Sequence, residues 1–330
     1  MKIIITGAAG FIGSHLVDYI LKKKKKVQLI GIDNLEDGSI KNLNDAINKK
    51  NFKFVKADLC NLNQISKLFK NADYVIHLAA YSDVVPSINF PKEYMYNNIT
   101  STLNILKCVK EYKIKKIIYA ASSSCYGIPK KYPTSENEKI DCKYPYSISK
   151  NICEQIITHW SKLYKFSFIS LRLFNVYGTR SRTNSSYGAA LGVFLKQKLS
   201  NKPFTIVGNG NQKRDFVYVT DVCDAFYKSL NRNIINKIFN IGSGNPKSIN
   251  YLVSLIGGKK TFIKKRPGEP DITHANISFV KKHLNWSPKV SLDEGIKKVI
   301  INIDYWKNAP LWTKEKINIA TKQWFKYLKK

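Results

Sequence analysis

The sequence predicts an α/β protein: a doubly wound parallel sheet with helices on both faces, followed by a smaller C-terminal α/β part. Two observations carry the prediction of the parallel sheet, and a third carries that of the C-terminal part. Up to about residue 175, short runs rich in Ile, Val and Leu alternate with amphipathic stretches of helical period. The apolar runs show little polar alternation, which is typical of parallel strands that are covered on both faces. Beyond Tyr177, polar loops and turn signals divide the chain into shorter elements.

The expected elements follow from these two patterns. Strands are predicted for residues 2–6, 27–32, 52–57, 73–78, 116–122 and 167–173, and helices for residues 14–24, 62–70, 91–112 and 145–164. Residues 219–231 and 238–241 are expected to return to the first part. Residues 314–330 are expected to form a helix anchored by Trp324, Phe325 and Leu328. We therefore divide the chain into residues 1–178, joined by residues 218–241, and residues 179–330.

The composition narrows the class of protein. The six cysteines show neither a C-x-x-C pair nor zinc spacing with a histidine, so we expect reduced thiols, no metal site and a cytoplasmic protein. The N-terminal apolar run is too short for a signal peptide, and no apolar run reaches the roughly 18 residues of a membrane span. The formal net charge of +32 comes from lysines spread along the chain, without the aromatic ladder of a nucleic-acid site. We expect no nucleic-acid or membrane partner, and an anionic substrate.

A glycine-rich turn follows the first strand and opens the first helix. Gly7, Gly10 and Gly13 have the spacing G-x-x-G-x-x-G, which lets backbone N–H groups approach a pyrophosphate at a helix N-terminus. Asp33, at the end of the second strand, can accept hydrogen bonds from an adenosine ribose and would repel a 2′-phosphate, so the pattern predicts NAD rather than NADP. After the third strand, Asp58-Leu59 could meet the adenine edge, or Asp58 could be only a helix cap.

Tyr146 and Lys150 stand four residues apart on an expected helix, and therefore one turn apart on the same face. A tyrosine is a poor base at neutral pH because its phenol titrates near a pKa of about 10. The positive charge of Lys150 can stabilise the phenolate, and a hydroxyl from the run Ser122-Ser123-Ser124 can hold the reacting oxygen in line. The pattern predicts a group that removes the proton of an alcohol while a nicotinamide removes the hydride.

Together these motifs resemble the extended short-chain dehydrogenase/reductase group of nucleotide-sugar epimerases and dehydratases, over essentially all 330 residues. The motifs that carry the resemblance are Thr6 to Gly13, His77-Leu78-Ala79-Ala80, Asn98, Ser122 to Gly127, Tyr146 to Lys150, Arg172 to Gly178, Arg214-Asp215-Phe216-Val217 and Arg266-Pro267-Gly268-Glu269. The resemblance implies a Rossmann domain that keeps NAD bound and a C-terminal domain that closes over a nucleotide-diphosphate sugar. It also implies a homodimer in which residues 98–112 and 145–164 form a four-helix bundle.

Residue by residue, the resemblance assigns the catalytic and cofactor roles. Tyr146 matches the family's catalytic base, Lys150 the partner that also binds the nicotinamide ribose, and Ser122 the residue that hydrogen-bonds the reacting hydroxyl. The implied cofactor contacts are Gly7, Gly10, Phe11, Ile12, Gly13, Asp33, Asn34, Asp58, Leu59, Leu78, Ala79, Ala80, Asn98, Tyr146 and Lys150. We interpret His77 as a structural histidine at a strand end and Cys125 as an unreactive thiol.

The resemblance also implies a substrate site. Arg214 and Arg266 match two arginines that clamp the substrate diphosphate, a task that suits the fork of a guanidinium, and Asn175 matches a further contact to it. The remaining implied substrate contacts are Ser82, Ser87, Ser123, Ser124 and Thr273. The chain departs from the family pattern at Ser101, where Gly is usual, and at Asn276, where Asp is frequent.

Family resemblance leaves the reaction open, but two residues restrict it. The family's 4,6-dehydratases carry Asp and Glu where this chain has Ser123 and Ser124, and its UDP-glucuronate decarboxylases carry Glu at the second position. A serine hydroxyl cannot replace a carboxylate as an acid/base at neutral pH. The sequence therefore predicts inversion at C4 through a transient 4-keto sugar. Another reaction of the family (UDP-glucuronate epimerisation or decarboxylation, 4,6-dehydration or 4-keto reduction) and a non-catalytic NAD-binding sensor are the alternatives.

The sugar is predicted less narrowly than the reaction. Thr273 stands where the family's 4-epimerases gate the substituent at C2, and a small residue there admits an N-acetyl group. Residues 184–193 also resemble the UDP-N-acetylglucosamine 4-epimerases. An N-acetylhexosamine therefore fits, while UDP-glucose, UDP-galactose and a UDP-uronic acid stay open, and precursor synthesis for a surface polysaccharide or glycan is the expected setting.

Overall fold

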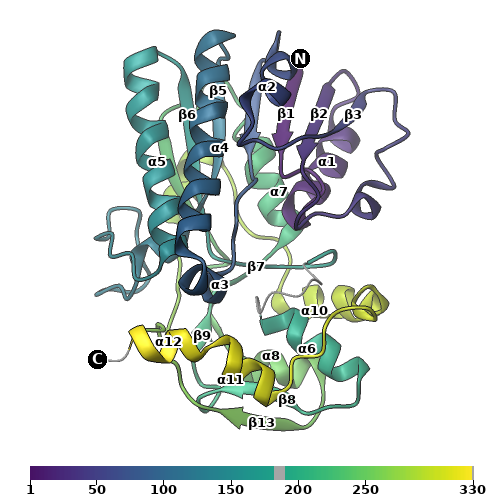
Figure 1. Cartoon of the computed structure of the whole chain (residues 1–330), viewed down its shortest axis with the longest axis vertical. Coiled ribbons are helices and arrows are strands. Elements are labelled where there is room, and N and C mark those ends of the chain that lie inside the picture. Colours follow the sequence, from purple (N-terminus) through teal and green to yellow (C-terminus); the bar gives the residue numbers. More distant parts are fainter. Residues whose placement is uncertain (182–189, 329–330) are drawn as a thin grey trace.

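A parallel sheet of seven strands forms the centre of the computed structural model, which describes residues 1–181 and 190–328 (Figure 1). Its strands are β1 (Lys2–Thr6), β2 (Gln28–Asp33), β3 (Phe52–Lys56), β4 (Tyr74–His77), β5 (Lys116–Ser122), β6 (Ser167–Leu173) and β11 (Lys237–Ile241). Their order in the sheet is β11-β6-β5-β4-β1-β2-β3. The order reverses between β1 and β4, where open α/β sheets bind ligands at the carboxyl ends of the strands. The predicted doubly wound α/β fold is confirmed.

Helices cover both faces of this sheet. One face carries α1 (Phe11–Lys23) and α7 (Val219–Lys228), and the other carries α4 (Pro91–Glu111) and α5 (Pro145–Tyr164). Neighbouring residues of β1 show why the strands lack polar alternation: Ile3 and Ile5 pack into the first core, whereas Ile4 packs into the second. All three side chains are fully buried. Both faces of a covered parallel strand must be apolar.

The second part is built from shorter elements. Three two-stranded sheets pair β7 (Asn175–Tyr177) with β10 (Phe216–Tyr218), β8 (Phe204–Val207) with β13 (Lys260–Ile263), and β9 (Lys213–Arg214) with β12 (Lys247–Ser248). The larger helices are α6 (Ala190–Leu199), α8 (Ile249–Ile256), α9 (Ser278–Leu284) and α10 (Leu292–Ile301). One hydrophobic core joins this part to the sheet, since Trp286 and Trp306 share a cluster with Ile3. The division of the chain near residue 178 remains a proposal.

Short helices border the carboxyl ends of the strands. They are η1 (Ile40–Leu43), α3 (Val84–Asn89) and η3 (Ser123–Tyr126), which follow β2, β4 and β5, and η4 (Ile303–Trp306) from the second part. Within the described ranges, no helix is long and apolar enough to cross a membrane, and no group of three or more His, Cys, Asp or Glu side chains could hold a metal ion. The six cysteines are free thiols.

Three predicted helices differ from the observed ones. Helix α1 begins at Phe11, not at residue 14, because the glycine turn itself supplies its N-terminus at Gly10. Residues 62–70 divide into α2 (Leu62–Ile65) and the 3-10 helix η2 (Ser66–Phe69). The predicted C-terminal helix divides into α11 (Lys314–Ala320) and α12 (Lys322–Tyr327), since the Thr321 hydroxyl donates to the Ile317 carbonyl at 2.8 Å and competes with the helical pattern.

Candidate active site

A cavity of about 560 Å³ lies at the carboxyl ends of β1, β2, β4 and β5, between the sheet and the C-terminal segment. It brings together motifs that are far apart in the sequence. The predicted site residues that line it are Gly7, Gly10, Phe11, Ile12, Gly13, Asp33, Asn34, Asp58, Leu59, Leu78, Ala79, Ala80, Ser82, Ser122, Tyr146 and Lys150.

The glycine turn is packed so closely that side chains are excluded from it. Gly7 has φ of +70°, and a Cβ there would lie 2.8 Å from the Ala79 nitrogen. A Cβ on Gly13 would overlap the Gly7 carbonyl oxygen. Gly10 caps α1 without a side chain, so the first N–H groups of this helix stay available at the cavity wall. This turn fits a pyrophosphate, which a helix N-terminus binds through backbone N–H groups and the helix dipole.

Asp33 is held in place by the turn that it faces. Its Oδ2 accepts the Ala9 N–H at 3.0 Å, and its Oδ1 accepts the Leu35 N–H at 2.9 Å. Burial raises the pKa of this carboxyl, and backbone hydrogen bonds from Leu35, Ala9 and Gly10 oppose the shift. A carboxylate has about four lone-pair sites, so Asp33 can still accept from a ribose hydroxyl. Together with the glycine turn, this geometry fits a dinucleotide whose ribose has a free 2′-hydroxyl.

Ser122, Tyr146 and Lys150 line the same cavity. Ser122 ends β5, and Tyr146 and Lys150 lie in the first two turns of α5. The start of α5 is fixed because the Ser147 hydroxyl accepts the Tyr144 N–H at 3.1 Å. The Ser122 side chain hydrogen-bonds with Tyr146, and the Ser124 Oγ lies 2.9 Å from the Ser122 Oγ. A hydroxyl pair of this kind can position a substrate alcohol beside the phenol.

Burial shifts the two titratable groups in opposite directions. It raises the pKa of Tyr146 to about 12, although the hydrogen bond with Ser122 acts against the shift. It lowers the pKa of Lys150 to about 8, with the ammonium 4.3 Å from the centre of the Tyr119 ring. Bringing the Tyr146 pKa to near 7 therefore takes about 7 kcal/mol of phenolate stabilisation, instead of roughly 4 kcal/mol for an ordinary phenol. Lys150 and a positively charged nicotinamide ring are the cations that can supply it.

Arg214 and Arg266 converge on one carboxylate. The Arg214 Nη2 lies 2.9 Å from the Glu269 Oε1, and the Arg266 Nη1 lies 3.7 Å from the Glu269 Oε2. Nearby, the Thr273 hydroxyl donates to the Asn175 Oδ1 at 2.9 Å and accepts the Asp215 N–H at 3.0 Å. Two guanidinium groups that share a counter-charge form a basic centre suited to a diphosphate.

Arg214, Arg266, Asn175 and Thr273 are not among the described residues that line the cavity. Asn175 lies between Phe174 and Val176, which do line it, and Ser123 and Ser124 begin η3 directly after Ser122. The segment 184–193, which resembles the UDP-N-acetylglucosamine 4-epimerases, is only partly described, because residues 184–189 lie outside the described ranges. Gly192 and Val193 of this segment line the cavity.

Two of the predicted contacts, Asn98 and Ser87, have their side-chain polar groups paired within the protein. The buried Asn98 side chain accepts the Tyr81 N–H at 2.8 Å and donates to the Tyr81 carbonyl at 3.1 Å and to the Ser149 hydroxyl at 2.9 Å. Ser87 is fully buried and donates to the Val84 carbonyl at 2.6 Å. Neither is among the described residues that line the cavity. Both lie behind the loop after β4. Their polar side-chain groups pair with backbone groups that burial would otherwise leave without a partner.

His77 and Cys125 have the structural surroundings that we expected. The buried His77 ring bridges the Thr6 hydroxyl at 2.8 Å and the Thr102 hydroxyl at 3.1 Å, and burial lowers the pKa of this histidine to about 3. Burial raises the pKa of the Cys125 thiol to about 12, so almost no thiolate exists at neutral pH.

The cavity has further lining residues that the motifs did not indicate. They are Glu36, Asp37, Gly38, Ser39, Asn42, Asp83, Asn97, Ser101, Arg180, Tyr305, Ala309, Pro310 and Trp312, among others. The polar run after Asp33 is a signal for the first of these, because loops after strands carry binding residues. Tyr305, Pro310 and Trp312 have no such signal, since only tertiary packing brings the C-terminal segment over the sheet.

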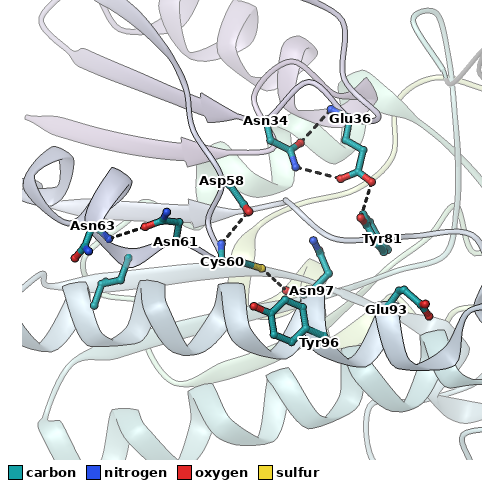
Figure 2. Close-up of a pocket in the computed structure, with 11 residues that line it drawn as sticks. Asn34, Glu36, Asp58, Cys60, Asn61, Asn63, Tyr81, Glu93, Tyr96 and Asn97 are labelled. Atoms are coloured by element: carbon teal, nitrogen blue, oxygen red, sulfur yellow. Dashed lines mark hydrogen bonds between the residues drawn. The ribbon is translucent and has the colours of Figure 1, made fainter.

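A second cavity, of about 540 Å³, adjoins the first, and Asn34, Glu36, Asp58, Tyr81 and Asn97 line both (Figure 2). Glu36 lines both cavities, and its carboxylate accepts a hydrogen bond from the Tyr81 hydroxyl at 2.6 Å. Asp58 accepts the Cys60 N–H at 2.9 Å, whereas Asn61 is the N-cap of α2. Asp58 therefore stabilises the turn after β3 and lines the cavity, and it is not the helix cap.

Comparison with known proteins agrees with this geometry. The model of the NAD dependent epimerase/dehydratase family matches residues 3–242. The UDP-glucuronate 4-epimerase of Thermodesulfobacterium geofontis is 34% identical over 331 residues, which cover 96% of this chain and 97% of that protein.

Two solved structures are similar over most of both chains. The UDP-glucuronic acid 4-epimerase of Bacillus cereus, solved with UDP-glucuronic acid and NAD, is 35% identical with a TM-score of 0.85, covering 93% of this chain and 99% of that one. The UDP-N-acetylglucosamine 4-epimerase of Methanobrevibacter ruminantium, solved with UDP-N-acetylmuramic acid, is 32% identical with a TM-score of 0.83, covering 91% and 98%. The chain therefore belongs to the NAD dependent epimerase/dehydratase family and is an enzyme with NAD as its cofactor.

Proposed function

We propose that this enzyme inverts C4 of a UDP-hexose or UDP-N-acetylhexosamine through a transient 4-keto sugar. The observation that carries the proposal is the meeting of Ser122, Tyr146 and Lys150 in one cavity with the glycine turn and Asp33. Beside Ser122 stand Ser123 and Ser124, whose hydroxyls cannot act as the acid/base pair that 4,6-dehydration needs. Together, Ser122, Tyr146 and Lys150 can oxidise and re-reduce one carbinol carbon with NAD.

Each residue has a defined task in that reaction. Ser122 holds the C4 hydroxyl, Tyr146 takes its proton, and the Lys150 ammonium stabilises the phenolate. When bound, NAD would supply the hydride acceptor for the oxidation at C4 and, as NADH, the hydride donor for the reduction. Arg214 and Arg266 hold the diphosphate while the 4-keto sugar turns to present its other face, after which Tyr146 returns the proton. The cycle is redox-neutral and needs no second substrate.

The proposal of an N-acetylhexosamine as the sugar is based on Thr273. Its side chain is small, and its hydroxyl is already occupied by Asn175 and by the Asp215 N–H. A small residue at this position leaves room for an N-acetyl group at C2, which supports an N-acetylhexosamine. Similar proteins act on UDP-glucuronate as well, so a UDP-uronic acid is the neighbouring candidate within the same reaction.

One observation favours a second candidate reaction. Asp83 lines the cavity, and after burial its charge is the main influence that raises the pKa of Tyr146. A carboxylate near the catalytic tyrosine could exchange a proton at C5, as 4,6-dehydration requires. This second candidate predicts deuterium at C5 of the product in heavy water, whereas 4-epimerisation predicts none.

We also propose a cytoplasmic homodimer that makes precursors of a surface polysaccharide or glycan. The dimer would form through the outer faces of α4 and α5, as the family resemblance implies. Its support is the apolar surface of α5, on which Leu163 is 57% exposed and Ile148 is 39% exposed.

The experiment that tests the proposed reaction follows sugar protons by NMR. Purified protein is incubated without added NAD with a panel of UDP-, dTDP- and GDP-sugars. We expect the anomeric signal of the C4 epimer to appear for at least one UDP-hexose or UDP-N-acetylhexosamine. Loss of water or of carbon dioxide from the sugar, without C4 inversion, would contradict the proposal.

A further inference from the structure

The C-terminal helix α12 contacts the loop that carries Arg266. Its Trp324 is buried in a small apolar cluster with Tyr144, Val85 and Ile317, apart from the two large cores. The sequence indicated Trp324 only as an anchor for a terminal helix, whereas the structure places it against substrate-site elements.

Three contacts tie Trp324 to this site. Its indole Nε1 donates to the Pro267 carbonyl at 2.8 Å, and its ring centre lies 4.8 Å from that of Tyr144. The guanidinium carbon of Arg266 lies 5.7 Å from the indole ring centre. A cation that packs on a ring face keeps its in-plane N–H donors for other partners. The indole can therefore hold Arg266 without using the donors that a diphosphate needs.

Tyr144 connects the same loop to the catalytic helix. Its hydroxyl donates to the Gly268 carbonyl at 2.8 Å, and Tyr144 is the N-cap of α5, two residues before Tyr146. The loop from Arg266 to Glu269 is therefore fixed on one side to α5 and on the other to α12. The indole and the phenol form one packed pair between them.

We propose that Trp324 is a positioning residue for the substrate diphosphate. It holds Arg266 in the orientation that binds the phosphates and, through Tyr144, fixes the distance between the bound diphosphate and Tyr146. The inference rests on the proposed function, because it requires a substrate with a diphosphate. Orienting a long cationic side chain before binding reduces the entropy that binding loses, so the effect belongs to substrate affinity.

The test measures UDP and uridine binding by calorimetry, using the NAD-loaded enzyme. Trp324→Leu is expected to weaken UDP binding on the order of 10-fold, because a hydrogen bond and a cation–π contact are lost. KM for the sugar nucleotide should rise by a similar factor while kcat changes less than about twofold. Binding of uridine, which has no phosphate, and the NAD content should stay as in the wild type. Tyr327→Leu, an exposed aromatic of the same helix, is the matched control.

A double-mutant cycle tests whether Trp324 affects UDP binding through Arg266. In an Arg266→Ala background, Trp324→Leu should weaken UDP binding less than about twofold further. Trp324→Phe keeps an aromatic ring and loses the N–H donor, so it should give an intermediate loss of UDP affinity. This variant replaces Trp324→Leu in the test if Trp324→Leu does not fold.

Two outcomes would overturn the inference: unchanged UDP binding in a folded Trp324→Leu enzyme, or equal losses of UDP, uridine and NAD. The readout is independent of turnover. A wild type that binds UDP through Trp324 but does not epimerise would disprove the proposed function and leave this inference standing.

Discussion

Burial of Tyr146 and Lys150 opposes the ionised forms that the proposed acid–base chemistry at Ser122 requires. Burial penalises the charged form of both titratable groups, so it raises the pKa of Tyr146 to about 12 and lowers that of Lys150 to about 8. Each group then needs the other's charge, because a buried ammonium favours a neighbouring phenolate.

Replacing Tyr146 by Phe removes the proposed base and leaves the ring in place. We expect turnover to fall by at least about 100-fold, since acid–base catalysis contributes on that order, with NAD content unchanged. Initial rates and the absorbance of extracted dinucleotide measure both quantities. Tyr164→Phe, near the other end of α5, should keep the wild-type rate. A Tyr146→Phe enzyme of wild-type rate would show that the base lies elsewhere.

The buried Lys150 predicts a pH dependence of stability. Its pKa is about 8 in the folded protein and 10.5 in the unfolded chain, so the unfolded chain binds more protons between these values. The cost of burying the charge is full below pH 8 and shrinks as pH rises to 10.5. Lys150→Met should raise the free energy of unfolding by about 3 kcal/mol at pH 7 and by much less at pH 10.

Urea unfolding of dinucleotide-free protein at pH 7 and pH 10 measures this difference. Lys162→Met, an exposed lysine on the same helix, should change stability little at either pH. An equal gain from Lys150→Met at both pH values would exclude titration of Lys150 as the cause.

At the scale of elements, α5 is fixed to the sheet by a buried polar network. Glu154, two turns after Tyr146, accepts the Ser170 hydroxyl at 2.6 Å and the Arg172 Nη2 at 2.6 Å. The Arg172 Nη1 also donates to the Tyr126 hydroxyl at 2.9 Å, which links β6 to η3. The network joins the helix of Tyr146 to β6, the strand beside the one that ends at Ser122, so it keeps the proposed catalytic residues in register.

Breaking this network should destabilise the protein strongly. The Glu154 and Arg172 side chains are each 6% exposed, and removing one partner of a buried pair costs about 3 kcal/mol or more. Glu154→Gln should lower the free energy of unfolding by that amount in urea titrations. The matched variant Asp304→Asn breaks the exposed pair with Lys307 at 3.0 Å and should cost less than about 1 kcal/mol. Similar losses in the two variants would contradict the role given to burial.

At the scale of the whole molecule, α4 and α5 pack side by side on one face of the sheet (Figure 1). If their outer faces form the dimer, Leu163→Glu places a buried charge in each half of the interface and should give a monomer. Sedimentation velocity measures the change. Ile319→Glu replaces a side chain that is 75% exposed on α11 and should leave the oligomeric state unchanged. A Leu163→Glu protein that sediments like the wild type would exclude this interface.

The sequence by itself determined the features that depend on local geometry. The spacing of Gly7, Gly10 and Gly13 and the helical offset of Tyr146 and Lys150 are local, so the cofactor turn, the proposed catalytic pair and the doubly wound sheet could be predicted. The boundaries of α1 and the division of the last helix could not, because a glycine cap and one hydroxyl decided them.

Tertiary structure alone decided the surroundings of these residues. It placed Asn98 behind a loop, brought Trp312 over the cavity and set Trp324 against Pro267. It also buried the Tyr146 phenol, which raises the pKa of this group to about 12. The reason is the same for Asn98, Trp312, Trp324 and the pKa of Tyr146. Burial and contacts between distant segments depend on how the whole chain packs, and no short stretch of sequence contains that information.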